Sequence, residues 1–213
     1  ALGILRGGQP RADPGQPLSG RGGAERADLL EPRRQQRRAA LDLGHRTSVD
    51  LDIFVREDFD SERLAETLAN AIPSVRIVSR SSGTLYAEVG DVPVSILRYR
   101  YPLLAPLRTK PGVALRAASQ EDLACMKLSA IAGRGAAKDF WDLSELLGRG
   151  VAGGDLATVL ELFRTKYASE DVGHVVRSLA YFGDADASPL PRGLSAERWS
   201  SIKADIAARV KAL

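Results

Sequence analysis

The hydrophobic pattern of the chain is most regular between residues 49 and 55. Apolar residues occupy positions 49, 51, 53 and 55, and Asp50 and Asp52 lie between them. Successive side chains of a β-strand point to opposite faces of a sheet. The alternation therefore predicts a strand over 49–55 with one apolar face and one acidic face.

Neighbouring segments predict a helix and three further strands. Asp60 or Ser61 is a suitable cap for a helix that carries an apolar stripe and ends before Pro73. Strands are expected over 75–79, 84–89 and 92–99, with a tight hairpin at residues 90–91 between the last two.

Beyond Tyr101 the chain changes to a helical pattern. A proline-punctuated loop comes first, and Ser119 with Asp122 then resembles a capping box. Helices are expected over 119–132, 137–147, 155–167, 170–182 and 195–212. The predicted fold class is α/β (α+β), a small mixed β-sheet flanked by helices and followed by a C-terminal helical region.

The first 38 residues differ from the rest in composition. They hold seven glycines, four prolines and eight arginines, without a sustained helical or strand period. Such a stretch buries too little apolar surface to offset its ordering entropy, so we expect it to be irregular. The predicted organisation is an irregular segment over 1–38, an α/β core over 39–118 and a helical region over 119–213.

Composition and charge limit the compartments and partners that fit the chain. The formal net charge of +3 permits a phosphate-bearing partner without requiring one. Cys125 is the only cysteine, which excludes an internal disulfide and fits a reducing compartment. No apolar run approaches the roughly 20 residues that span a bilayer. We expect a cytoplasmic protein with no membrane partner.

The acidic face of the predicted strand suggests a metal site. Asp50 and Asp52 are two residues apart, so their carboxylates leave the same face about 6.6 Å apart along the strand. Oxygen ligands of this kind suit Mg²⁺ or Mn²⁺, which bind through one or two carboxylates and substrate phosphates. An ordinary solvated strand face is the alternative reading. Just before the strand, Gly44, Arg46 and Ser48 supply a turn, a cation and a hydroxyl that can hold phosphate.

Three segments together resemble one protein family. Residues 44–54 (GHRTSVDLDIF) resemble the first motif of the AbiEii-type nucleotidyltransferases, a bacterial toxin and phage-defence branch of the polymerase-β-like superfamily. Residues 118–131 (ASQEDLACMKLSAI), followed by Arg134, resemble the family's downstream block. Residues 138–143 (KDFWDL) resemble its basic-Asp-x-x-Asp segment. The likeness covers about residues 40–148 and implies that the α/β core is a nucleotidyltransferase core.

The resemblance also implies roles for individual residues. Asp50 and Asp52 would bind the catalytic metal, and Lys127 would approach the nucleotide triphosphate. Asp139 and Asp142 would lie near the same cleft, Asp139 as a catalytic residue and Asp142 as a nucleotide-binding residue. Asp139 and Asp142 are three residues apart on a predicted helix and share a face. The alternative is a pair of acids favoured by the helix dipole, with Lys127 solvated.

The sequence departs from the family pattern at two points. A Gly-Gly-Ser or Gly-Gly-Thr turn is expected about nine residues before Gly44, where the chain has 35–37 (QQR). That turn lets backbone amides approach the triphosphate, and its loss predicts weakened nucleotide binding. A third carboxylate on a later strand is replaced by Ser95, which leaves the general base open. One hypothesis for residues 1–38 is translation in another reading frame, which a comparison of the three frames of the coding DNA tests.

Two functions follow from these observations. The first is metal-dependent transfer of a nucleotide from an NTP to an acceptor, which the resemblance extends to tRNA, in a toxin with a cognate antitoxin. Basic and aromatic residues between 98 and 116 could bind the RNA: Arg98, Tyr99, Arg100, Tyr101, Arg108, Lys110 and Arg116. A charged loop with its tyrosines packed inward is the alternative for that segment. The second function is a catalytically inactive domain that binds RNA or a protein.

Overall fold

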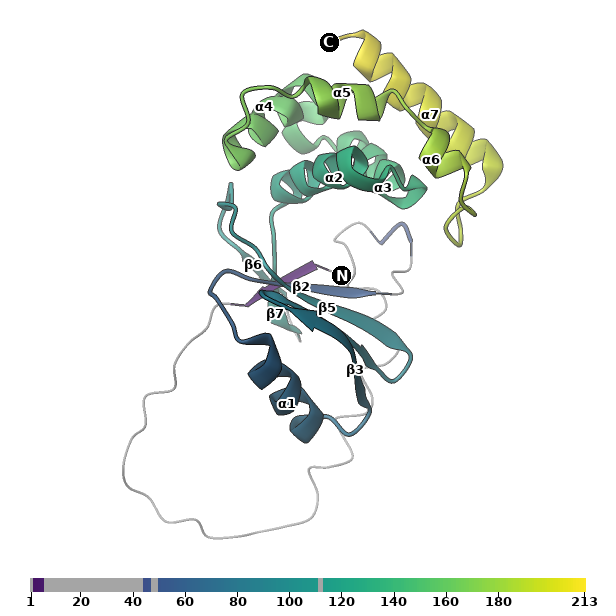
Figure 1. Cartoon of the computed structure of the whole chain (residues 1–213). Helices are drawn as coiled ribbons and strands as arrows, with labels where there is room; N and C mark the ends of the chain where they lie inside the picture. Colours follow the sequence, from purple (N-terminus) through teal and green to yellow (C-terminus); the bar gives the residue numbers. More distant parts are fainter. Residues whose placement is uncertain (1, 6–43, 47–49, 111–112) are drawn as a thin grey trace. The chain divides into compact units, whose positions relative to one another are not determined.

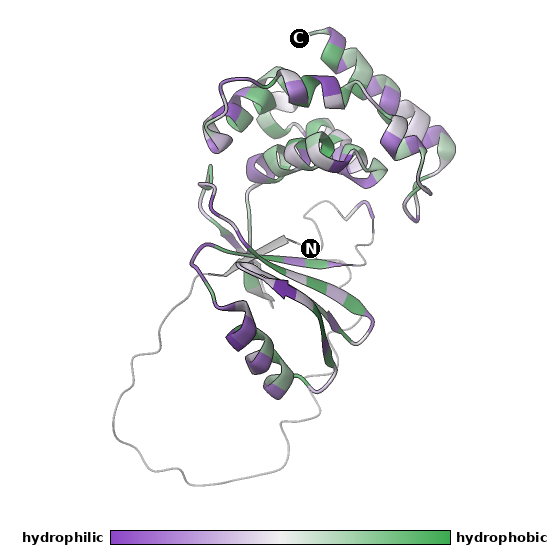
Figure 2. Cartoon of the chain, viewed as in Figure 1, coloured by the Kyte–Doolittle hydropathy of each residue, from purple (hydrophilic) through white to green (hydrophobic). Residues whose placement is uncertain are grey.

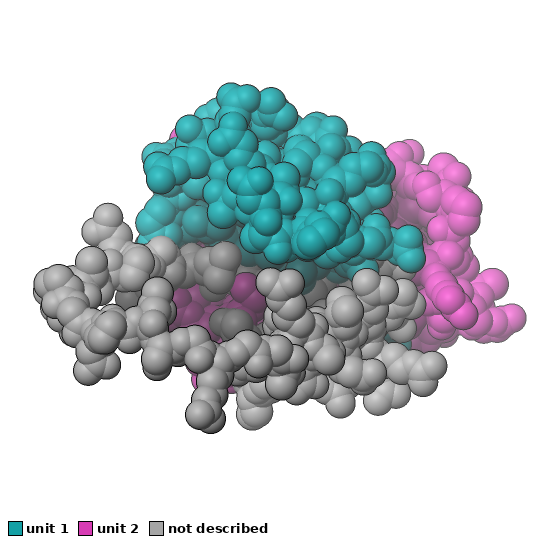
Figure 3. All heavy atoms as spheres, turned by 90° about the horizontal axis from the view of Figure 1, so that it is seen from below, with its two compact units in different colours: residues 1–99 teal, residues 100–213 magenta. Residues whose placement is uncertain are grey.

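The computed structural model describes residues 2–5, 44–46, 50–110 and 113–213. The chain divides into two compact units, Ala1–Tyr99 and Arg100–Leu213 (Figure 3). The boundary predicted between residues 118 and 119 lies at the start of the first long helix, whereas the two compact units meet after Tyr99. The predicted domain organisation stays a prediction.

A mixed β-sheet forms the first unit. Its strands are β1 (Leu2–Leu5), β2 (Leu51–Val55), β3 (Val75–Ser81), β4 (Thr84–Val89) and β5 (Val92–Arg98), in the spatial order β3-β4-β5-β2-β1. β2 runs parallel to β1 and β5, whereas β4 is antiparallel to β3 and β5 (Figure 1). The predicted mixed sheet is therefore confirmed.

Helix α1 (Ser61–Ala71) covers one face of this sheet (Figure 1). The Asp60 carboxylate caps it by accepting hydrogen bonds from the backbone N–H groups of Glu62 and Arg63. Ala65 of the helix packs in a core cluster with Leu85, Val94 and Ile96 of the strands, and further apolar side chains of the unit surround them. Hydrophobic and hydrophilic residues alternate along β2, β4 and β5 (Figure 2). The face away from α1, called the polar face below, carries Asp52 and Ser95 beside the apolar pair Phe54 and Leu97.

The second unit consists of a short hairpin and a group of helices. Its elements are β6 (Arg108–Lys110), β7 (Val113–Ala117), α2 (Gln120–Arg134), α3 (Ala137–Gly148), the 3₁₀ helix η3 (Val151–Gly154), α4 (Leu156–Tyr167), α5 (Gly173–Leu179), α6 (Gly183–Asp186) and α7 (Ala196–Lys211). The rings of Phe140, Phe182 and Trp199 meet in its core at centroid distances of 5.1–6.0 Å. None of the described helices is long and apolar enough to span a bilayer.

Three sequence predictions are corrected here. The segment after Tyr101 is not only a loop, because β6 and β7 pair in it; the prolines concealed the alternation of Val113, Leu115 and Ala117. The helix expected over 170–182 is shorter, since α5 spans Gly173–Leu179 and a separate short helix, α6, begins only at Gly183; the Asp171 carboxylate accepts a hydrogen bond from the Gly173 backbone N–H where α5 begins. Residues 2–5 are a strand, because their apolar run pairs with β2 despite the irregular composition that follows.

A buried ion pair joins α2 and α4 inside the second unit. Lys166 Nζ lies 2.5 Å from Asp122 Oδ1 and 2.7 Å from the carbonyl oxygen of Pro102, and both charged side chains are fully buried. The same carboxylate accepts hydrogen bonds from the Ser119 hydroxyl and the Leu104 backbone N–H. Each buried charge is therefore compensated, which a buried ion pair requires if it is not to destabilise the fold.

Replacing Lys166 by methionine is expected to lower the free energy of unfolding by about 3–5 kcal/mol, because Asp122 is left as an unpaired buried charge. Trp141 and Trp199 are the only tryptophans of the chain, and both lie in the second unit. Tryptophan fluorescence during urea unfolding therefore measures the stability of this unit. Lys203→Met is the matched control, because Lys203 pairs with Asp186 at the surface, and it should cost less than about 1 kcal/mol. Equal effects of the two substitutions would contradict a structural role for the buried pair.

Candidate active site

The first part of the candidate site is the acidic end of β2. Asp52 lies in the strand and Asp50 directly precedes it, and both side chains are half-buried. The neighbours of Asp52 in the strand, Leu51 and Ile53, pack against the core cluster under α1. Because adjacent side chains of a strand alternate, Asp52 points to the opposite, polar face. The predicted strand with one apolar and one acidic face is thus confirmed for the described residues.

The register of the sheet adds a hydroxyl beside the acids. Asp52 pairs with Ser95 in the parallel β2–β5 ladder, and directly paired residues lie on the same face. Glu88 pairs with Pro93 in the ladder and forms a 2.5 Å ion pair with Arg76, while Asp91 lies in the turn after β4. Ser95, not a carboxylate, is therefore the neighbour of Asp52, as the sequence indicated.

This donor set fits a hard divalent cation. Two carboxylates and a hydroxyl are all oxygen donors, which Mg²⁺ and Mn²⁺ prefer, and Mg²⁺ usually completes its shell with water and substrate phosphates. Within the described ranges no three His, Cys, Asp or Glu side chains gather in a way that could hold a metal by themselves.

The turn before β2 is described only in part. Gly44 adopts φ +58°, a left-handed conformation that favours glycine, and a Cβ added there would meet no atom within 4 Å. The glycine is thus needed for the backbone conformation and not for close packing. Arg46 is half-buried, and the predicted nucleotide-binding residue Ser48 lies outside the described residues, as do positions 35–37.

The second part of the candidate site is a cluster of charges between α2 and α3. Lys127 Nζ lies 3.1 Å from Asp139 Oδ1 and 2.6 Å from Asp142 Oδ2, and both carboxylates are fully buried. Arg134 donates hydrogen bonds from Nε and Nη2 to Asp139 at 2.8 and 3.0 Å. The alternative in which Lys127 is solvated is wrong, since its exposed fraction is 8%. The predicted shared face of the two acids agrees with this arrangement, because both contact one ammonium group.

The two parts of the candidate site belong to different units. Asp50 and Asp52 lie in the first unit, whereas Lys127, Asp139 and Asp142 lie in the second. Their participation in one cleft stays a prediction. The residues expected to bind RNA are divided in the same way, with Arg98 and Tyr99 in the first unit and those from Arg100 onward in the second.

Several of these RNA-binding candidates have structural contacts. Tyr99 is buried and meets the ring of Phe54 edge to face at 5.3 Å, and Arg98 pairs with Asp58. Tyr101 is 48% exposed and stacks edge to face on Tyr167. The inward-packing alternative therefore holds for Tyr99, and RNA binding by the segment stays a prediction.

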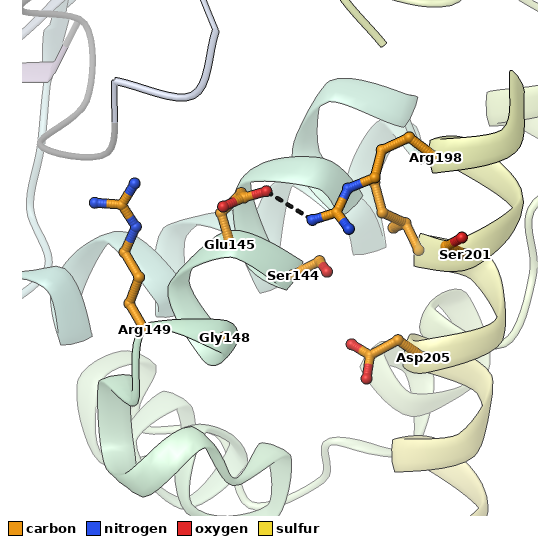
Figure 4. Close-up of a pocket in the computed structure, with 8 residues that line it drawn as sticks. Ser144, Glu145, Gly148, Arg149, Arg198, Ser201 and Asp205 are labelled. Carbon is orange, nitrogen blue, oxygen red and sulfur yellow. Dashed lines mark hydrogen bonds and ion pairs between the residues drawn. The ribbon is translucent and has the colours of Figure 1, made fainter. Parts of the chain in front are cut away.

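A hollow of about 500 Å³ lies between α3 and α7, and none of the predicted site residues of the second unit lines it. Its lining residues are Ser144, Glu145, Gly148, Arg149, Arg198, Ser201, Ile202 and Asp205. Figure 4 shows Arg198 reaching across the rim to Glu145, with 2.9 Å between the charged groups. The rim arginine and acid neutralise each other, so the hollow presents no concentrated charge for a phosphate.

The sequence did not reveal the buried Asp122–Lys166 pair, because Asp122 was interpreted only as a capping residue. A signal was present in α4, where Val159 and Phe163 mark the buried stripe and Lys166 falls three residues after Phe163. A lysine in a buried helical stripe is costly unless a buried partner such as a carboxylate compensates its charge.

The mixed sheet with α1 on one face, together with the helices of the second unit, makes the chain an α+β protein, and Asp-x-Asp lies where β2 begins. A family model for the nucleotidyl transferase AbiEii toxin of type IV toxin–antitoxin systems matches residues 38–212. The chain therefore belongs to the AbiEii nucleotidyltransferase toxin family. It is also 37% identical over 144 residues to the uncharacterized protein aq_aa25 of Aquifex aeolicus (strain VF5), a match that covers 67% of this chain and 68% of the relative.

Cys125 is expected to be unreactive in the folded protein. Cys125 lies on the buried side of α2 with no exposed surface, and this burial raises the pKa of its thiol to about 12. Because the thiolate is the reactive form, Ellman's reagent at pH 8 should modify no thiol in the native chain and one thiol after unfolding in urea. Rapid modification without urea would show that α2 opens readily.

Proposed function

We propose that the chain moves a nucleotide from an NTP to an acceptor with the help of Mg²⁺ or Mn²⁺ held by Asp50 and Asp52. The observation that carries the proposal is the position of Asp52 beside Ser95 on the polar face of the sheet, directly opposite the core under α1. A divalent ion bound there supplies charge neutralisation for the phosphates of the nucleotide. The family assignment supports the transfer reaction itself.

The residues of the chain divide the remaining work by their chemistry. The carboxylates of Asp50 and Asp52 bind the ion and fix its place on the strand. Gly44, Arg46 and Ser48 contact the phosphates, with the arginine offering charge-assisted hydrogen bonds. Ser95 is too weak a base to take the proton of the acceptor hydroxyl unaided, so the general base is left open.

Lys127 is proposed to neutralise negative charge that builds up on the transferring phosphate. In this proposal Asp139 and Asp142 are positioning residues, because each holds the Lys127 ammonium group at hydrogen-bonding distance. A phosphate that contacts Lys127 competes with at least one of these carboxylates.

The partners follow from the family. Membership of a type IV toxin–antitoxin family supports a cognate antitoxin protein, and a nucleotidyltransferase requires an NTP. We propose an RNA acceptor, of which tRNA is one candidate, and a cytoplasmic location, which suits a chain with one buried cysteine.

A second candidate function is supported by one specific observation. The family match begins at residue 38, so the residues where a Gly-Gly-Ser or Gly-Gly-Thr turn is expected lie just outside it. Residues 35–37 have the sequence QQR, which contains no glycine. Without such a turn backbone amides approach a triphosphate poorly. A domain that binds RNA or a protein without catalysis is the function that this observation favours.

The central test is transfer of labelled nucleotide to total RNA in Mg²⁺. Asp52→Asn is expected to lower the transfer rate at least about 100-fold, because it removes charge that acts on the reacting phosphates. Asp50→Asn should have a similar effect. Asp91→Asn is the matched control, since Asp91 is an exposed acid in the turn between β4 and β5, and it should leave the rate unchanged.

The same assay separates the two functions. A wild-type chain that transfers nucleotide in a manner insensitive to Asp52→Asn would refute the role of the strand acids. A chain that binds RNA but transfers nothing, even with Gly-Gly-Ser introduced at 35–37, supports the inactive module. Recovery of transfer on introducing this turn supports the enzyme.

A further inference from the structure

Tyr86 occupies an unusual place on the polar face of the first unit. The ladder pairs Asp52 with Ser95, Ser95 with Tyr86, and Tyr86 with Ser79, so these residues form one row across β2, β5, β4 and β3. Directly paired residues share a face. Tyr86 therefore lies on the face of the strand acids, and its exposed fraction is 44%.

The exposed apolar surface of this unit is concentrated beside that ring. Val78 and Tyr86 are the large hydrophobic side chains that are exposed among the described residues of the first unit. The β3–β4 register shifts between Ile77 and Ser79, so Val78 is the extra residue of a β-bulge next to the Tyr86 row. Ile77 packs toward the core, which directs Val78 to the polar face.

The distance from the acids matches the dimensions of a nucleotide. Tyr86 is two strands from Asp52, which corresponds to about 10 Å at the usual spacing of neighbouring strands. Phosphates bound at Asp52 therefore leave the sugar and base of a nucleotide within reach of the ring. A flat aromatic ring accepts any nucleobase by stacking, without sequence-specific hydrogen bonds.

We propose that Tyr86, flanked by Val78, is a stacking platform for a nucleobase of the proposed transfer reaction. The inference rests on the proposed function, since it takes the strand acids as the site of the phosphates. The base belongs either to the NTP or to the 3′ end of the acceptor RNA. The NTP and the RNA end present the same kind of planar base, and the experiment tests each of the two ligands in its own arm.

The test uses the fluorescence of 2-aminopurine, which is quenched when the base stacks. The full-length chain is titrated in Mg²⁺ against 2-aminopurine riboside triphosphate in one arm and against an RNA oligonucleotide ending in 2-aminopurine in the other. Tyr86→Ala is expected to raise the Kd about tenfold in one of the arms and to reduce the quenching, whereas Tyr86→Phe keeps the ring and the wild-type Kd.

The matched control is Tyr181→Ala, which removes an exposed tyrosine of the second unit and should leave both Kd values unchanged. Wild-type quenching that survives Tyr86→Ala, or absence of quenching in both arms, overturns the platform. Asp52→Asn in the transfer assay tests the proposed function separately. Loss of transfer in Asp52→Asn with unchanged binding by Tyr86→Ala refutes the platform alone, and the opposite pair of results refutes the role of Asp52 alone.

Discussion

The parallel pairing of β2 with β5 is the constraint on which the acidic site depends. The pairing places Leu51 opposite Val94 and Asp52 opposite Ser95, so the core face of the two strands is apolar, while the other face carries the acid and the serine beside the Phe54–Leu97 pair. A slip of one residue would exchange the faces and direct Asp52 into the core under α1. Burying an unpaired carboxylate in the core is costly. The apolar residues of β2 therefore fix the face to which its acidic side chain points.

In the second unit, charged side chains are buried in the core instead of being kept out of it. Its buried charged side chains are Asp122, Lys127, Asp139, Asp142 and Lys166, and each has an oppositely charged partner. These pairs join α2 to α3 and to α4 at fixed positions. Apolar side chains could pack the same helices, but matched charges add a further penalty for a shifted register, because a shift leaves a buried ion without its partner. The described residues of the first unit contain no buried charge of this kind.

The sequence predicted those features that depend on local patterns. The alternation of apolar and polar residues predicted β2, β4 and β5, and capping residues predicted α1 and the start of α2. Each of these signals lies within a few residues of the chain. The β6–β7 hairpin and β1 were missed, since strand pairing depends on partners that the composition of a segment does not reveal. The Lys166–Asp122 pair was missed for the same reason, because its members are 44 residues apart.

In the candidate site, too, the features set by neighbouring residues could be predicted from the sequence, and those set by distant contacts could not. The same-face placement of the strand acids follows from a period of two, and the position of Ser95 beside Asp52 required the register of the sheet. For Lys127 the family resemblance implied proximity to phosphate, which stays a prediction, and the structure shows that its ammonium group is held by two carboxylates. Arg134 differs, because its side chain is 56% exposed while it binds Asp139. The cluster therefore presents its positive charge to solvent mainly through Arg134, whereas the Lys127 ammonium group is buried between its two carboxylates.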